Sequence, residues 1–113
     1  MEKVRFGIIG GGMAGPLNAG ALQDIPEAEI AAFCDINLEL AKSFSEKYNI
    51  PSYCTDYREL LERKDIDAVC VVTPPFLHEE MVIAAARAGK HVMCEKPISV
   101  DCLSADRMIA ACH

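Results

Sequence analysis

A cluster of glycines sets the strongest limit on how this chain folds. Glycines stand at positions 10, 11, 12 and 15, directly after the short apolar segment Val4 to Ile9. The spacing Gly10-x-Gly12-x-x-Gly15 between a strand and a helix is typical of a turn that binds the pyrophosphate of a dinucleotide, because the helix N-terminus offers unpaired N–H groups to the anion. The pattern by itself is equally consistent with a flexible glycine-rich turn in another α/β fold.

An acidic residue further along supports the dinucleotide interpretation. Asp35 ends the apolar segment Glu29 to Cys34, about 20 residues after the last glycine, where a dinucleotide-binding fold has the acid that receives the adenosine ribose hydroxyls. The residues that follow it, 36–39, contain no arginine for a 2′-phosphate and add a second carboxylate. NAD is therefore predicted in preference to NADP. The alternative is that Asp35 is the N-cap of the following helix.

Short apolar segments alternate with segments of helical spacing along the chain. Four of them predict strands buried on both faces, as in a parallel sheet: Val4 to Ile9, Glu29 to Cys34, Ala68 to Val72 and His91 to Cys94. Strands that alternate with helices imply right-handed crossovers. The predicted fold class is α/β, a doubly wound parallel sheet with helices on both faces, in one domain over residues 1–113.

The helices are predicted from their ends. Asn37 is a candidate N-cap for a helix that ends before Pro51, and Asp56 with Glu59 forms a candidate capping box. A third helix runs from about residue 76 to residue 88, and Gly89 is its expected stop. A last helix from about residue 99 is predicted to have one apolar face, whose exposure would favour self-association into a homo-oligomer: Ala105, Met108, Ile109 and Cys112.

Charge and cysteine content exclude several classes of protein. Acidic residues outnumber basic ones 17 to 11 without a basic cluster, so nucleic acid is a poor partner. The N-terminal apolar run is too short for a signal sequence or a membrane span, which predicts a cytoplasmic protein without a membrane partner. The six cysteines include no Cys-x-x-Cys pair, so free thiols and no metal site are expected.

A proline motif follows the segment Ala68 to Val72. Thr73, Pro74 and Pro75 end this strand at the carboxyl edge of the sheet, which is where ligands bind in open α/β folds. His78 falls in the first turn of the next helix. Local hydrogen bonding of its imidazole is favoured over a catalytic role.

A lysine motif follows the last predicted strand. Glu95, Lys96 and Pro97 come directly after His91 to Cys94, so Lys96 is predicted at the same edge, where its charge can help deprotonate a substrate hydroxyl. The alternative is a solvated loop cation paired with Glu95.

Together these motifs resemble the N-terminal half of the glucose-fructose oxidoreductase and inositol dehydrogenase family (Gfo/Idh/MocA), over essentially the whole chain. The resemblance implies a Rossmann-type NAD-binding domain that ends before the sixth strand, with the C-terminal substrate-binding and catalytic domain absent from this chain. It also implies hydride transfer between nicotinamide and a hydroxyl-bearing carbon of a sugar or cyclitol, with Lys96 as the catalytic residue in this half. The alternative is a separate NAD(H)-binding sensor or scaffold without catalysis.

The motifs and the resemblance give one set of expected cofactor-binding residues. They are Gly10, Gly12, Met13, Ala14, Gly15, Asp35, Ile36, Thr73, Pro74, Pro75, His78, Glu95 and Lys96.

Overall fold

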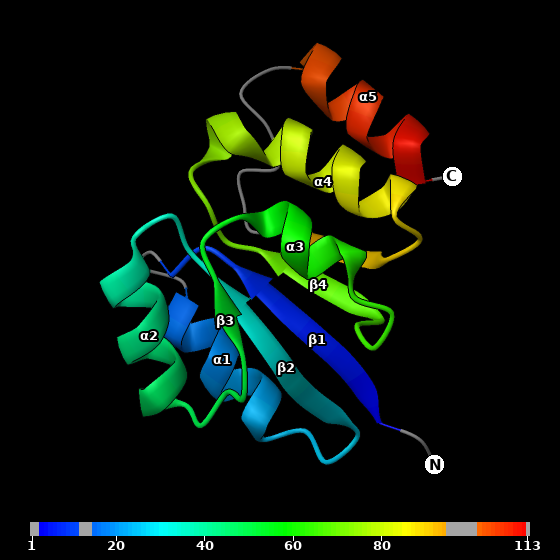
Figure 1. Ribbon diagram of the computed structural model, residues 1–113. Helices are drawn as coiled ribbons and strands as arrows, with labels where there is room; N and C mark the ends of the chain where they lie inside the picture. The colour runs from blue at the N-terminus through cyan, green and yellow to red at the C-terminus, as the bar shows by residue number, and fades with distance from the viewer. Residues whose placement is uncertain (1–2, 12–14, 95–101, 113) are drawn as a thin grey trace.

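The computed structural model describes residues 3–11, 15–94 and 102–112, and at its centre is a sheet of five parallel strands (Figure 1). The elements in chain order are β1 (Val4–Ile9), α1 (Gly15–Gln23), β2 (Ala28–Cys34), α2 (Leu38–Lys47), β3 (Tyr53–Cys54), α3 (Tyr57–Glu62), β4 (Ala68–Val71), a 3₁₀ turn (Pro75–Leu77), α4 (His78–Arg87), β5 (His91–Cys94) and α5 (Cys102–Cys112). The strand order is β3-β2-β1-β4-β5. The predicted doubly wound parallel sheet is confirmed. β5 is not buried on both faces as predicted: His91 and Met93 are exposed and Val92 and Cys94 are half-buried, because β5 lies at an edge of the described sheet.

Helices cover both faces of this sheet. α1 and α2 lie on one face and α3 and α4 on the other, with α5 packed along the outer side of α4 (Figure 1). The chain changes faces after β3, where it passes from one side of β1 to the other. Because of this reversal, the connections that follow β1 and β4 run to opposite faces of the sheet. The carboxyl ends of these two neighbouring strands are the place where open α/β sheets bind ligands.

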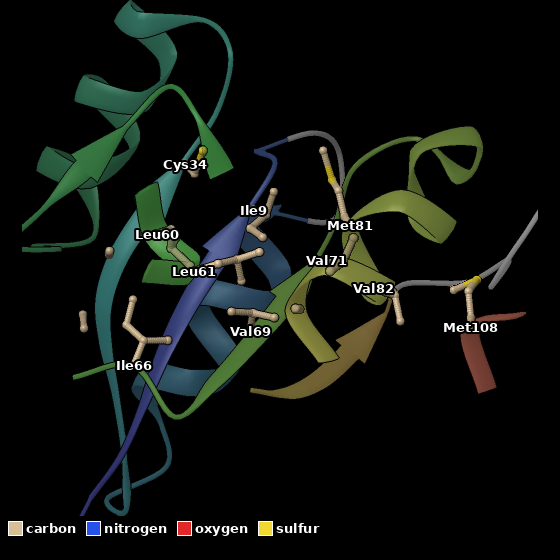
Figure 2. Packing of buried hydrophobic residues seen from close by; sticks show 13 residues of the cluster. Ile9, Cys34, Leu60, Leu61, Ile66, Val69, Val71, Met81, Val82 and Met108 are labelled. Carbon is tan, nitrogen blue, oxygen red and sulfur yellow. The ribbon is translucent and has the colours of Figure 1, made fainter. Parts of the chain in front are cut away.

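Neighbouring residues of β1 enter two different cores. Ile8 is fully buried among side chains that include Phe44 of α2, and Ile9 is buried among side chains that include Leu60 of α3. Figure 2 shows the second core, in which Val82 of α4 lies between the sheet and α5. Because side chains alternate across a strand, a central strand must be apolar on both faces.

The predicted N-caps of two helices are confirmed. The Asn37 side-chain oxygen accepts from the Leu40 N–H at 3.1 Å and begins α2. The Asp56 carboxylate accepts from the Arg58 N–H at 3.0 Å and begins α3. Each side chain satisfies an N–H group that the first helical turn leaves without a backbone partner.

Gly89 ends α4 as predicted. Its φ of +80° is in the left-handed region, where glycine carries no Cβ penalty. Its N–H donates to the Ala86 carbonyl and the Lys90 N–H donates to the Ala85 carbonyl, both at 3.0 Å. This pair of bonds is a Schellman motif, which reverses the chain into β5.

The edge strand β3 is an element that the apolar pattern does not reveal. It has two residues, and Cys54 pairs with Cys34 of β2. The Phe33 and Asp35 N–H groups donate to the Ser52 and Cys54 carbonyls at 3.0 and 3.2 Å. Since β3 lies at an edge of the described sheet and its side chains are partly exposed, its residues need no apolar run to form a strand.

The inward face of α5 differs from the predicted one. Met108 is 1% exposed, whereas Ile109 is 51% exposed and Cys112 is exposed. Arg107 forms an ion pair with Glu79 of α4, which aligns the two helices. The expectation that Met108 presents an open apolar surface is therefore wrong, because α4 already covers it; self-association stays a prediction.

A glycine within β1 makes room for α3. A Cβ added at Gly7 would lie 2.6 and 3.0 Å from the two methyl carbons of Leu60, which is itself 1% exposed. Such distances are shorter than van der Waals contact. The missing side chain at Gly7 thus lets α3 approach the sheet.

We expect Gly7→Ala to lower the free energy of unfolding by about 1–3 kcal/mol, because an added methyl overpacks a filled core. The measurement is urea denaturation. Gly20→Ala in α1 is the matched control, since nothing lies within 4 Å of a Cβ at that position, and alanine in a helix interior gains about 0.5–1 kcal/mol over glycine. Equal effects of the two substitutions would contradict the role of Gly7.

Candidate functional site

The carboxyl ends of β1, β2 and β4 meet at one edge of the sheet and border a cavity of about 360 Å³. Its walls are formed by Ile9, Gly10, Gly11, Cys34, Asp35, Ile36, Leu40, Thr55, Tyr57, Val72, Thr73, Pro74, Phe76, Leu77 and Met81. The fold therefore brings five of the expected site residues to one cavity. They are Gly10, Asp35, Ile36, Thr73 and Pro74.

Gly10 joins the ends of three strands. Its φ is +95°, and its N–H donates to the Cys34 carbonyl at 2.7 Å. A Cβ at this position would lie 2.7 Å from Thr73 Cγ2 and 3.0 Å from the Thr73 nitrogen. Both the backbone conformation and the space require glycine, as the turn predicts.

The Asp35 carboxylate is fixed by hydrogen bonds from two backbone N–H groups. One carboxylate oxygen accepts from the Gly11 N–H at 3.0 Å, and the other accepts from the Asn37 N–H at 2.9 Å. The N-cap of α2 is Asn37, so the alternative in which Asp35 caps that helix is wrong. The two bonds fix the carboxylate at the end of β2, half-buried beside the glycine turn.

Gly11 is constrained even though the glycine pattern leaves its position open. A Cβ there would lie 2.9 Å from the ring carbon Cζ of Phe33 and 3.5 Å from the Asp35 carboxylate. The glycine lets its N–H reach Asp35. Only the spatial position of Phe33, which is distant in sequence, reveals this requirement.

The Thr73-Pro74 turn forms the wall on the β4 side. The Thr73 hydroxyl donates to the Met81 sulfur at 3.3 Å, and the His78 Nε2 atom donates to the Thr73 carbonyl at 2.7 Å. His78 is 1% exposed and begins α4, directly after the 3₁₀ turn. Its imidazole thus forms a local hydrogen bond that supports the Thr73-Pro74 turn. His78 is not part of the cavity wall.

Ile36 is the most exposed of the large apolar side chains in the described part of the chain, at 90%. It lies at the cavity, between Asp35 and the cap of α2. An isoleucine side chain in this position gains no stabilisation from burial in the protein core. It presents apolar surface to whatever enters the cavity.

The cavity also has a thiol in its wall. Cys34 pairs in register with Cys54, and burial, followed by the neighbouring Cys54 thiol, raises the pKa of Cys34 well above its usual range. Since the thiolate is the reactive form, Cys34 is a packing residue and not a nucleophile.

Part of the expected set lies outside the described residues: Gly12, Met13, Ala14, Glu95 and Lys96. Gly15 is the first residue of α1, and Pro75 begins the 3₁₀ turn. Sequence reasoning missed Thr55 and Tyr57, which reach the cavity from the segment after β3. That segment carries no glycine or proline signal, so nothing local points to it.

Two further properties concern metals and membranes. Across residues 3–11, 15–94 and 102–112, no three His, Cys, Asp or Glu side chains gather in a group that could hold a metal ion. Within the same ranges, every helix is too short or too polar to cross a membrane.

Comparison with known proteins gives consistent matches along the chain. A family model described as "Oxidoreductase family, NAD-binding Rossmann fold" matches residues 4–113. The myo-inositol 2-dehydrogenase of Thermotoga maritima is 39% identical over 106 residues, which are 94% of this chain and 32% of that enzyme. An uncharacterized oxidoreductase of Bacillus subtilis is 38% identical over 110 residues, 97% of this chain and 32% of that protein.

A solved structure agrees with these matches. The crystal structure of a 3-ketoreductase from Actinomadura kijaniata, in complex with NADP and TDP-benzene, superimposes with a TM-score of 0.92 at 37% identity, over 98% of this chain and 34% of that one. The chain thus spans about a third of the length of the relatives that it matches.

We expect His78→Leu to lower the free energy of unfolding by about 1–3 kcal/mol, because the Thr73 carbonyl loses its donor in a half-buried place. Chemical denaturation measures the change. His91→Leu is the control, since His91 is exposed at the start of β5. A loss of the same size in both variants would show that the Thr73 contact is not the cause.

Proposed function

The chain belongs to the oxidoreductase family with an NAD-binding Rossmann fold (Gfo/Idh/MocA), and from this membership we propose that it is the dinucleotide-binding part of a dehydrogenase. The enzyme transfers a hydride between nicotinamide and a hydroxyl-bearing carbon of a sugar or cyclitol. The observation that carries the proposal is the Asp35 carboxylate, held beside the Gly10-Gly11 turn at the cavity.

The residues at this edge fit a dinucleotide. Gly10 and Gly11 lie so close to Thr73 and Phe33 that neither position has room for a side chain. In a dinucleotide-binding turn, glycines of this kind make the turn tight and let the backbone approach the pyrophosphate. Each Asp35 oxygen accepts one backbone N–H and keeps acceptor capacity for a ribose hydroxyl. α1 begins at Gly15, the last glycine of the motif, and the N-terminus of a helix favours an anion.

The protein's share of the reaction is binding, orientation and proton transfer. A bound nicotinamide supplies the site that gives or takes the hydride. Asp35 holds the ribose, the Thr73-Pro74 turn forms the wall, and Lys96 takes or returns the proton of the substrate hydroxyl. The assignment of Lys96, together with Glu95 beside it, rests on the sequence motif and on family membership.

The proposed cofactor is NAD in preference to NADP. A 2′-phosphate would meet the negative charge of Asp35, whereas a 2′-hydroxyl can donate to it. Glu39 adds a second carboxylate in the first turn of α2. The relative from Actinomadura kijaniata is in complex with NADP, so the preference is a property to be measured in this chain.

NADH should bind more tightly than NADPH by about 1–3 kcal/mol, the range of one charged hydrogen bond gained or lost. Asp35→Asn should narrow this gap, because it removes the charge and keeps an acceptor. Titration calorimetry of both cofactors gives the two dissociation constants. The control is Asp24→Asn, an exposed carboxylate outside the cavity wall; equal constants for the two cofactors in the unmodified chain contradict the NAD preference.

In an enzyme that joins this chain to a substrate-binding domain, Lys96→Ala should lower kcat by about 10²-fold or more, the range of general acid–base catalysis. The dissociation constant of NADH should change little, because the group acts mainly in the transition state. Steady-state kinetics and NADH titration separate the two effects, with Lys64→Ala as an exposed control. Turnover that survives the substitution identifies Lys96 as a loop cation.

The same kinetic and binding measurements separate the dehydrogenase from the alternative function, a sensor or scaffold that binds NAD(H) without catalysis. A protein that binds NADH but oxidises no sugar or cyclitol is such a sensor or scaffold.

A further inference from the structure

Tyr57 is a cavity residue to which neither the motifs nor the proposed chemistry gives a role. It is the first residue of α3, directly after the Asp56 cap, and it is half-buried. It packs against the core on the α3 side and borders the cavity that contains Asp35. Its ring is therefore in the wall that faces an entering ligand.

The Tyr57 ring packs against the core and is close to two charged groups. The Arg58 guanidinium lies over the ring, 5.3 Å from its centroid. Burial, followed by the Glu80 carboxylate of α4, raises the pKa of the Tyr57 phenol, which therefore stays protonated. The ring is thus a neutral aromatic surface held on the α3 side of the core.

We propose that Tyr57 positions the nucleobase of the bound dinucleotide, with its ring as the aromatic wall on which the base stacks. This inference rests on the proposed function, since a base enters the cavity only if its ribose is bound at Asp35. The residue acts by orientation and takes no part in the transfer of hydride or protons.

The composition of the cavity supports a flat apolar ligand next to the ribose site. Ile36, Leu40 and Leu77 contribute aliphatic side chains around Tyr57. A nucleobase has two flat aromatic faces, and any base can be held by stacking on an aromatic side chain. Tyr57 supplies such an aromatic side chain in the wall of this cavity.

A second aromatic residue at the cavity is less suited to this role. Phe76 also lies in the wall but is 69% exposed. It is part of the 3₁₀ turn before α4, and its ring is mostly in solvent. Tyr53 of β3 is the matched control, because it is an exposed aromatic residue outside the cavity wall.

The first experiment separates the two ends of the cofactor. The dissociation constants of ADP-ribose and of reduced nicotinamide mononucleotide are measured by calorimetry on the chain and on three variants, Tyr57→Ala, Tyr57→Phe and Tyr53→Leu. Tyr57→Ala should weaken ADP-ribose about 10-fold, within the range measured for loss of one stacking ring. Tyr57→Phe and Tyr53→Leu should stay within about 3-fold, and nicotinamide mononucleotide should be unaffected by all three.

A spectroscopic readout distinguishes stacking from a structural role. The chain has no tryptophan and three tyrosines, so its emission reports on tyrosine alone. Saturation with AMP should quench part of this emission through contact of the base with the Tyr57 ring. The quenching should disappear in Tyr57→Phe, although that variant still binds AMP.

The outcomes distinguish the two hypotheses. No binding of NADH or ADP-ribose to the unmodified chain overturns the proposed function. Normal binding of ADP-ribose to a folded Tyr57→Ala variant, or quenching that persists in Tyr57→Phe, overturns the role of Tyr57 and leaves the proposed function intact. If Tyr57→Ala does not fold, the quenching experiment on Tyr57→Phe decides by itself.

Discussion

Burial of β1 on both faces is the constraint on which the rest of this structure depends. Ile8 and Ile9 are adjacent in sequence and lie in different cores, so each face of the strand requires its own layer of helices. Neither layer can be removed without exposing a row of apolar side chains, each worth about 1.5–3 kcal/mol. The glycine at position 7 belongs to the same constraint, because it sets how closely α3 covers the strand.

The cavity follows from where β1 ends. Parallel strands all point their carboxyl ends to one edge, and the connection that crosses from β3 to β4 leaves this edge uncovered beside β1. Gly10 then brings the backbone against Thr73, while the Gly11 N–H anchors Asp35. The Asp35 carboxylate therefore lies next to the glycine turn. The carboxylate offers acceptors for ribose hydroxyls, and a turn of this kind offers backbone N–H groups for a phosphate.

Helix α4 supports the opposite wall through two hydrogen bonds. From its first turn, His78 donates to the Thr73 carbonyl. One turn on, Met81 accepts from the Thr73 hydroxyl. The position of α4 thus sets the position of the proline turn. A ligand in this cavity meets walls whose side chains are already ordered, so less conformational entropy is lost on binding.

Local patterns in the sequence were sufficient for four of the five strands of the described sheet, for the caps at Asn37, Asp56 and Gly89, and for the meeting of Gly10, Asp35 and Thr73 at one edge. Each depends on backbone conformation, hydrogen bonding within a few residues, or the alternation of apolar side chains, which the order of amino acids itself determines. Only the tertiary structure decided that Met108 faces inward, that Gly11 must be small, and that Tyr57 reaches the cavity. These depend on α4, Phe33 and the segment after β3, which come close in space only when the helices pack, and no short-range pattern carries that information.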